Sequence, residues 1–111
     1  MLQGALDLHM HSSPDGIPRS LTDLQAARDA AKAGMRAIML KNHLTPTYGR
    51  AAVADEAVDG VRVFGGIVLN KQVGGINPAA VDAALAMGAK CVWMPTASSS
   101  AHIAHFKADP A

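Results

Sequence analysis

The sequence predicts an α/β fold built from parallel βα repeats. The main observation is a module that recurs three times, in which a helix-like stretch ends in Gly and is followed by an apolar residue, a basic residue and a strand. The module covers residues 34–40, 60–64 and 88–94. Gly is the usual left-handed cap just past a helix, and the intervals between the apolar strands suit βα units better than hairpins. The resulting order β-α-β-α-β-α-β, followed by a tail, implies a parallel sheet.

The helix starts support the same order of elements. Thr22 and Gln25 have the spacing of a capping box, and Asn77 followed by Pro78 supplies an N-cap and a preset first turn. Between these two helices, a shorter one is expected over about residues 50–58. The predicted strands end near four residues: His11, His43, Leu69 and Thr96.

Composition and charge exclude several classes of protein. Half of the residues are hydrophobic, 17% are charged and the net charge is +1, so the chain is neither disordered nor a nucleic-acid binder by charge. No apolar run approaches the ~20 residues that cross a bilayer, and a signal peptide is not apparent. The single Cys91 cannot form an internal disulfide, which favours a reducing cytoplasm. The expected partner is therefore a small-molecule substrate, with no membrane or nucleic acid involved.

The most informative segment is the first predicted strand, residues 5–12, which ends in His-x-His. Because side chains alternate along a strand, Asp7, His9 and His11 are expected on one face, with Asp7 placed to orient the imidazoles. Neutral imidazole is a favoured ligand for zinc, iron, manganese or nickel, and a neighbouring carboxylate fixes its tautomer. A His pair at a strand end is also common without any metal, so the rest of the sequence decides between these interpretations.

Further polar residues gather where parallel βα repeats carry function, at the carboxyl ends of the strands. Lys41 and His43 end the second strand, and they share a parity that directs them to the same side as the His pair. Asn42, between them, is expected to point away. A third His at the same rim favours a metal site made of His9, His11 and His43.

The sequence resembles the opening of the amidohydrolase and PHP (polymerase and histidinol phosphatase) metal-dependent hydrolases. PHP domains have a D-x-H-x-H strand, a nearby S-D-G-like turn and a second strand that ends in T-D-H. The matching segments here are 7–12 (Asp-Leu-His-Met-His-Ser), 14–16 (Pro-Asp-Gly) and 41–43 (Lys-Asn-His). By motif the resemblance covers residues 5–43. It implies that His9 and His11 are metal ligands, that Asp15 lies near a third ligand position, and that His43 matches the second-strand His.

Two features of the family pattern are missing. No Glu ends the third strand in residues 65–70, and the fourth strand, residues 91–95, has no Lys that could become carboxylated. Lys41 lies on the second strand instead. The chain is therefore expected to be a divergent branch, to which metal number and identity do not carry over.

The length predicts only part of such a fold. A complete (β/α)₈ barrel takes ~250 residues, and four strands use up this chain of 111 residues. We therefore expect the N-terminal half of a TIM-like barrel, with residues 1–111 as a single partial domain truncated at its C-terminus. A homo-oligomer formed through the open sheet edge is the alternative way to cover that edge.

The function that these features predict is metal-dependent hydrolysis of an amide, lactone or phosphoester. His9 and His11, helped by His43 or Asp15, would hold a divalent cation, with zinc as the first choice and manganese, iron or nickel as alternatives. Lys41 would stabilise a developing oxyanion or anchor an anionic substrate. The competing prediction is a non-catalytic βα module that binds a ligand or a partner chain.

Other chemistry-bearing residues have simpler interpretations. Residues 98–100, three consecutive Ser, suit an anion-binding loop but are more often plain loop. His102 and His105 could share a helical face, although a position near the terminus favours solvation. Cys91 lies in an apolar run and is expected to be buried and inert.

Overall fold

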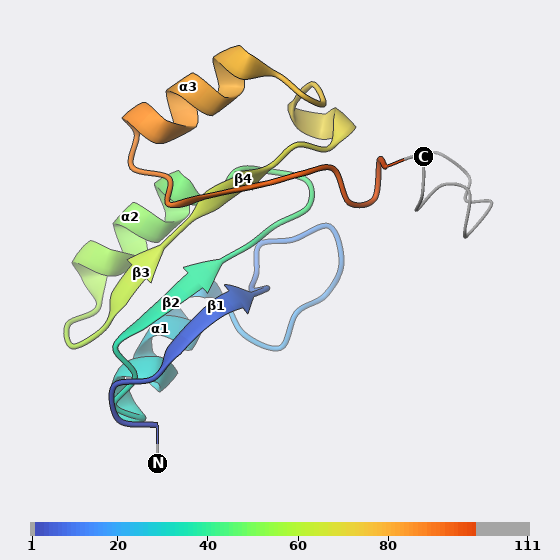
Figure 1. The fold of residues 1–111 in the computed structure, drawn as a ribbon. Coiled ribbons are helices and arrows are strands. Elements are labelled where there is room, and N and C mark those ends of the chain that lie inside the picture. The colour runs from blue at the N-terminus through green and yellow to red at the C-terminus, as the bar shows by residue number, and fades with distance from the viewer. Residues whose placement is uncertain (1, 100–111) are drawn as a thin grey trace.

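The computed structural model describes residues 2–99 and has an α/β fold with parallel strands (Figure 1). The elements in chain order are β1 (Leu6–Met10), α1 (Asp23–Lys32), β2 (Ala37–Leu40), α2 (Tyr48–Ala57), β3 (Arg62–Phe64), β4 (Gly66–Val68), the 3₁₀ turn η1 (Lys71–Val73), α3 (Pro78–Ala86) and β5 (Cys91–Trp93). The named strands pair in parallel, in the orders β1-β2-β3 and β4-β5. The predicted α/β class and parallel strand arrangement are confirmed. Residues 100, 102 and 105 lie outside the described residues.

The strand expected to run up to Leu69 consists of two pieces, β3 and β4, with Gly65 between them. The first piece pairs with β2 and the second with β5, so the chain changes its pairing partner at Gly65. Thr47 fills the gap, because its hydroxyl accepts the Gly66 N–H (2.9 Å) and lies 2.7 Å from the Leu40 carbonyl oxygen, to which it donates. A side chain at Gly65 would collide with the backbone of Thr47. The break therefore comes from a close approach that only Gly permits.

The helices lie on one face of the sheet (Figure 1). Helices α1 and α2 pack against each other and both contact β2, while α3 packs on β4. Tyr48, at the start of α2, also contacts the apolar cluster under α3. The first cluster joins small residues of α1 and α2 to the strands: Ala26, Ala27, Ala30, Ile38, Leu40, Ala51, Ala54, Val58, Val61 and Val63. The second, smaller cluster contains Ile67, Leu69, Ala84 and Ala89.

We call the opposite side of the sheet the helix-free face, since no helix within residues 2–99 packs on it. Strand alternation and pairing assign its residues, because paired residues in a parallel ladder project to the same side. Ile38 and Leu40 face the helices, and so Met39 and its partner Phe64 face the other way. By the same argument the residues of the helix-free face include Met39, Phe64, Gly66, Val68 and Trp93.

The helix termini follow the predicted signals. The Thr22 hydroxyl accepts the Gln25 N–H (3.2 Å), and the Gln25 side chain accepts the Thr22 N–H (2.9 Å), which completes the capping box of α1. Asn77 caps α3 ahead of Pro78. The middle helix begins earlier than expected, at Tyr48 rather than near residue 50. No helix in the described part of the chain is long and apolar enough to cross a membrane.

Candidate functional site

Three imidazoles meet at the rim formed by the carboxyl ends of β1 and β2. The Nε2 atoms of His9 and His11 are 3.0 Å apart, and these two rings meet edge to face with their centroids 5.0 Å apart. The rings of His11 and His43 stack, also with a centroid separation of 5.0 Å and an interplanar angle of 23°. The structure therefore brings together the three residues that the sequence singled out as metal ligands.

The His9–His11 separation suits two kinds of contact. Two nitrogens bound to one ion at ~2.0–2.1 Å lie roughly 3.0–3.4 Å apart, and one neutral imidazole can also donate a hydrogen bond to another. His11 Nδ1 is buried and has no hydrogen-bond partner among residues 2–99. Within the same residues, no three His, Cys, Asp or Glu side chains are grouped so that they could hold a metal ion. The site as it stands thus presents two convergent nitrogens, with a third ring beside them.

The surroundings favour neutral imidazoles. Burial lowers the pKa of His11, and the positive charge of Arg19 lowers it further. Burial likewise lowers the pKa of His43, with a second contribution from the charge of Lys41. Only the neutral ring has a free nitrogen lone pair, so these environments keep both side chains competent as ligands or proton acceptors near neutral pH.

His43 is positioned by a buried hydrogen-bond network that the sequence analysis did not identify. Asn70 is fully buried, and its amide oxygen accepts the N–H groups of Thr96 (2.8 Å) and Ser98 (3.1 Å). Its amide nitrogen donates to the His43 carbonyl oxygen (3.0 Å) and to Thr96 Oγ1 (2.9 Å). Thr96 Oγ1 in turn lies 2.7 Å from His43 Nδ1. The loops after β2, β4 and β5 are thereby tied to the Asn70 side chain, and among residues 2–99 no hydrogen bond engages His43 Nε2.

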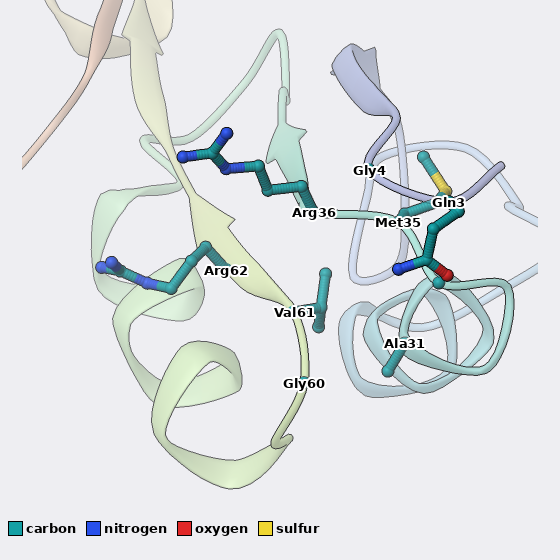
Figure 2. A pocket seen from close by; sticks show the side chains of 9 residues that line it. Gln3, Gly4, Ala31, Met35, Arg36, Gly60, Val61 and Arg62 are labelled. Carbon is teal, nitrogen blue, oxygen red and sulfur yellow. The ribbon is translucent and has the colours of Figure 1, made fainter.

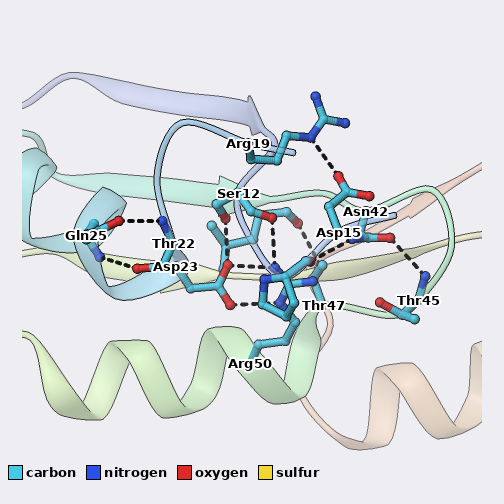
Figure 3. Close-up of polar contacts among 12 residues, drawn as sticks. Ser12, Asp15, Arg19, Thr22, Asp23, Gln25, Asn42, Thr45, Thr47 and Arg50 are labelled. Atoms are coloured by element: carbon cyan, nitrogen blue, oxygen red, sulfur yellow. Dashed lines mark hydrogen bonds and ion pairs between the residues drawn. The ribbon is translucent and has the colours of Figure 1, made fainter. Parts of the chain in front are cut away.

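Asp15 lies beside this cluster but is already engaged (Figure 3). Its carboxylate accepts hydrogen bonds from Arg19 Nε (2.7 Å) and from the Gly16 N–H (2.6 Å). Burial opposes its charged form, yet these hydrogen bonds outweigh burial and hold the pKa of Asp15 below its ordinary value. Asp15 is therefore an ionised group at the rim that is paired with the cationic Arg19.

Lys41 and Asn42 project as strand parity predicts. Lys41 is 7% exposed, and its ammonium lies 4.9 Å from the ring centroid of Trp93 on the helix-free face. Asn42 turns away and shapes the loops, since it donates to the Pro14 carbonyl oxygen and accepts the N–H groups of Leu44 and Thr45. Lys41 thus places a positive charge on the helix-free face, whereas Asn42 joins neighbouring loops.

Asp7 differs from the expected arrangement. Pairing places Asp7 opposite Ile38 and Met10 opposite Leu40, so three steps along β1 match two steps along β2. Strict alternation therefore does not extend from Asp7 to the histidines, and Asp7 accepts the backbone N–H of His9 (3.0 Å) rather than an imidazole N–H. The carboxylate supports a β-bulge, a feature that re-aims the following side chains.

A buried ion pair holds the loop that follows His11 (Figure 3). Arg50 of α2 donates to both carboxylate oxygens of Asp23 (2.8 and 2.7 Å) and to the Ser12 carbonyl oxygen (3.1 Å). The Ser12 hydroxyl donates to Asp23 (2.6 Å). Sequence reasoning missed this pair because its members are 27 positions apart on different helices. The only local signal was an acidic residue in the first turn of α1.

A cavity of about 640 Å³ lies at the other end of the sheet (Figure 2). Loops at the amino ends of the strands line it, with Gln3, Met35, Arg36, Val61 and Arg62 among the lining residues. Arg62 is engaged there with Asp55 at 3.0 Å. None of the three clustered histidines borders this cavity. In parallel βα folds the chemistry lies at the carboxyl ends, so we assign the candidate site to the histidine rim.

Comparison with known proteins gives a family without an assigned activity. The model of a family of unknown function, DUF6282, matches residues 4–111, nearly the whole chain. No curated protein and no solved structure matches the chain.

Proposed function

We propose that this protein, which belongs to the DUF6282 family of unknown function, is a metal-dependent hydrolase acting on an amide, lactone or phosphoester. The observation that carries the proposal is the convergence of His9, His11 and His43 at the carboxyl ends of parallel strands. When bound, a divalent cation would lower the pKa of water and polarise a carbonyl or phosphoryl oxygen of the substrate. Zinc is the first candidate because it favours imidazole nitrogen, with manganese, iron and nickel as alternatives.

Each residue of the rim would have a separate role, either in binding the cation or in binding the substrate. His9 and His11 would hold the cation through Nε2, because these atoms already lie 3.0 Å apart. The third ligand would be His43, whose Nδ1 is occupied by Thr96, or Asp15 after it leaves Arg19. Lys41 adds a positive charge that would stabilise negative charge on the substrate.

The proposed architecture is that of the N-terminal half of a TIM-like barrel. Three observations support it: the strands are parallel, the sheet order follows the chain order, and the helices pack on one face. A doubly wound sheet would instead have helices on both faces. Because Cys91 is unpaired, we further propose a reducing, cytoplasmic setting.

A second candidate function is a non-catalytic module that binds a small ligand or a second copy of the chain. One observation favours it, namely that residues 2–99 contain no preformed group of three metal-binding side chains. The two candidates differ in whether a stoichiometric metal is bound.

The deciding experiment is metal analysis of the purified protein after exposure to zinc or manganese and dialysis. We expect about one ion per chain in the parent protein and a loss of most of that metal in His9→Ala/His11→Ala. Gln3→Ala, at the opposite end of the sheet, is the control and should keep its metal. Amide, lactone and phosphoester substrates are assayed on the same samples. Equal metal content in the parent and the double variant would refute the metal site.

A further inference from the structure

We infer that the molecule bound at this site carries a permanent oxyanion group, a carboxylate or a phosphate, and that Lys41 binds this group above the ring of Trp93. The inference rests on the proposed function for the place of the reaction. It makes Lys41 a specificity-determining residue for an anionic substrate, rather than a group that serves only a charge developing during the reaction.

The Lys41–Trp93 contact on the helix-free face depends on the packing of the indole against Gly66. Trp93 pairs with Val68, and its ring lies against Gly66, where an added Cβ would come within 2.8 Å of Cζ3 of the indole. Gly66 therefore leaves the space that the indole fills. Lys41 extends from the end of β2 toward β5, and its Nζ lies 4.9 Å from the ring centroid. The Trp93 ring thereby contacts the ammonium, and no carboxylate within residues 2–99 forms an ion pair with it.

Lys41 lacks the paired carboxylate that the neighbouring Arg19 and Arg50 have within residues 2–99. Arg19 is paired with Asp15 and Arg50 with Asp23, both at 2.7 Å. Within residues 2–99, Lys41 forms no such ion pair, although it is 7% exposed. A buried ammonium is unfavourable unless an anion or hydrogen-bond acceptors replace its water. The Trp93 ring face satisfies one side of the ammonium, and an anion would complete its surroundings.

The position of Lys41 indicates which part of the bound ligand it would contact. His9 lies on β1 and His11 follows it, whereas Trp93 lies on β5, which pairs with β4 in the other sheet. Lys41 follows β2, two residues before His43 in the chain, and its ammonium lies over the Trp93 ring. A group bound over Trp93 would therefore be distinct from the bond that reacts beside His9 and His11.

Trp93 provides the test, because it is the single tryptophan of the chain. The fluorescence of the whole protein is followed while inorganic phosphate, or acetate in a separate arm, is added at constant ionic strength set with potassium chloride. We expect a saturable change in the millimolar range. Preference for phosphate indicates a phosphorylated ligand, and preference for acetate indicates a carboxylate ligand. A response that is not saturable for either anion overturns the inference.

Two variants and one control assign the response to Lys41. Lys41→Met should weaken anion binding at least tenfold, and Lys41→Arg should retain most of it, because Arg keeps the charge and binds oxyanions well. Lys90→Met removes an exposed lysine next to β5 and should bind like the parent protein. Equal anion binding by Lys41→Met and the parent overturns the inference. Circular dichroism checks the fold, and if Lys41→Met does not fold, Lys41→Gln takes its place in the titration, with the same weakening expected and equal binding to the parent again overturning the inference.

Failure of this inference can be separated from failure of the proposed function. His9→Ala/His11→Ala should lose metal and keep the phosphate or acetate response, whereas Lys41→Met should keep metal and lose that response. A protein that binds zinc but shows no saturable anion response would retain the metal site and lose this inference. A protein that binds the anion through Lys41 but no metal would have an anion site without the proposed hydrolytic centre.

Discussion

Two regions of the protein, β1 to β3 with their helices and β4 and β5 with α3, differ in how many apolar side chains they bury. Strands β1 to β3 with α1 and α2 enclose ten buried apolar residues, whereas β4 and β5 with α3 enclose four. Both regions also expose large apolar side chains, among them Leu6, Leu8 and Val53 in the first and Ile76, Leu85 and Met87 in the second. The difference between the regions therefore lies in the size of the buried core, and not in whether apolar side chains are exposed.

The less packed region nevertheless contains the best satisfied polar side chain of the rim. Asn70 is completely buried, and all four of its described hydrogen bonds join the loops that meet at His43. Buried amides with complete hydrogen bonding fix geometry more than they add free energy. The comparison indicates that the first region provides stability, while the second provides the positioning of the site.

The largest expected effect tests the difference in packing directly. Leu40→Ala should lower the free energy of unfolding by about 3 kcal/mol, because Leu40 is fully buried in the first cluster. Leu85→Ala removes the same atoms from a side chain that is 56% exposed on α3, and should cost less than about 1 kcal/mol. Urea unfolding, followed by circular dichroism, measures both. Equal losses would mean that the two regions are packed alike.

A second, smaller effect concerns the ion pair of the first region. Asp23→Ala should lower the free energy of unfolding by about 2 kcal/mol, since Arg50 would remain part-buried without its carboxylate. Asp29→Ala, on the exposed side of the same helix, is the matched control and should have little effect. Asp23→Ala should also bind less metal, because the hydroxyl of Ser12, next to His11, loses its hydrogen bond to Asp23. Unchanged stability would show that the pair contributes no net free energy.

The features that the sequence predicted correctly are those that depend on a few neighbouring residues. The Thr22–Gln25 box and the Asn77 cap need only local spacing. The meeting of the His11 and His43 rings needs only two neighbouring parallel strands. These signals predicted the three imidazoles at the carboxyl ends of the first two strands, where the structure has them.

The features that the sequence did not predict depend on two distant segments at once. The bulge at Asp7 depends on the register between β1 and β2. The alternation of side chains along β1 alone cannot predict it. The break at Gly65 exists because Thr47 approaches the strand, and the Asn70 network joins positions 26 to 28 residues apart. Such contacts become visible only once the fold is known.

The smallest predicted effect lies at the amino end of the first region, where Asp55 ties α2 to β3. Its carboxylate accepts the Val63 N–H (2.8 Å) and a hydrogen bond from Arg62 (3.0 Å). The Val63 N–H is the largest cause of a lowered pKa for Asp55, with Arg62 adding to it against the opposing effect of burial. A carboxyl whose pKa is lower in the folded state stabilises the protein above its ordinary pKa near 4, and loses this contribution as the pH falls through the folded-state pKa.

Asp55→Asn should therefore lower the free energy of unfolding by about 1 kcal/mol at pH 7, and its difference from the parent should shrink as the pH falls below about 4. Asp59→Asn removes an exposed carboxylate in the same connection, and as the control it should have little effect on the free energy of unfolding at pH 7. Urea unfolding between neutral and acidic pH measures the difference. Because Asp55 lies at the end of the sheet away from the histidines, metal content and the anion response of Trp93 should both stay unchanged. A difference that grows in acid would assign the stabilisation to the protonated carboxyl and reverse the role given to the Val63 N–H.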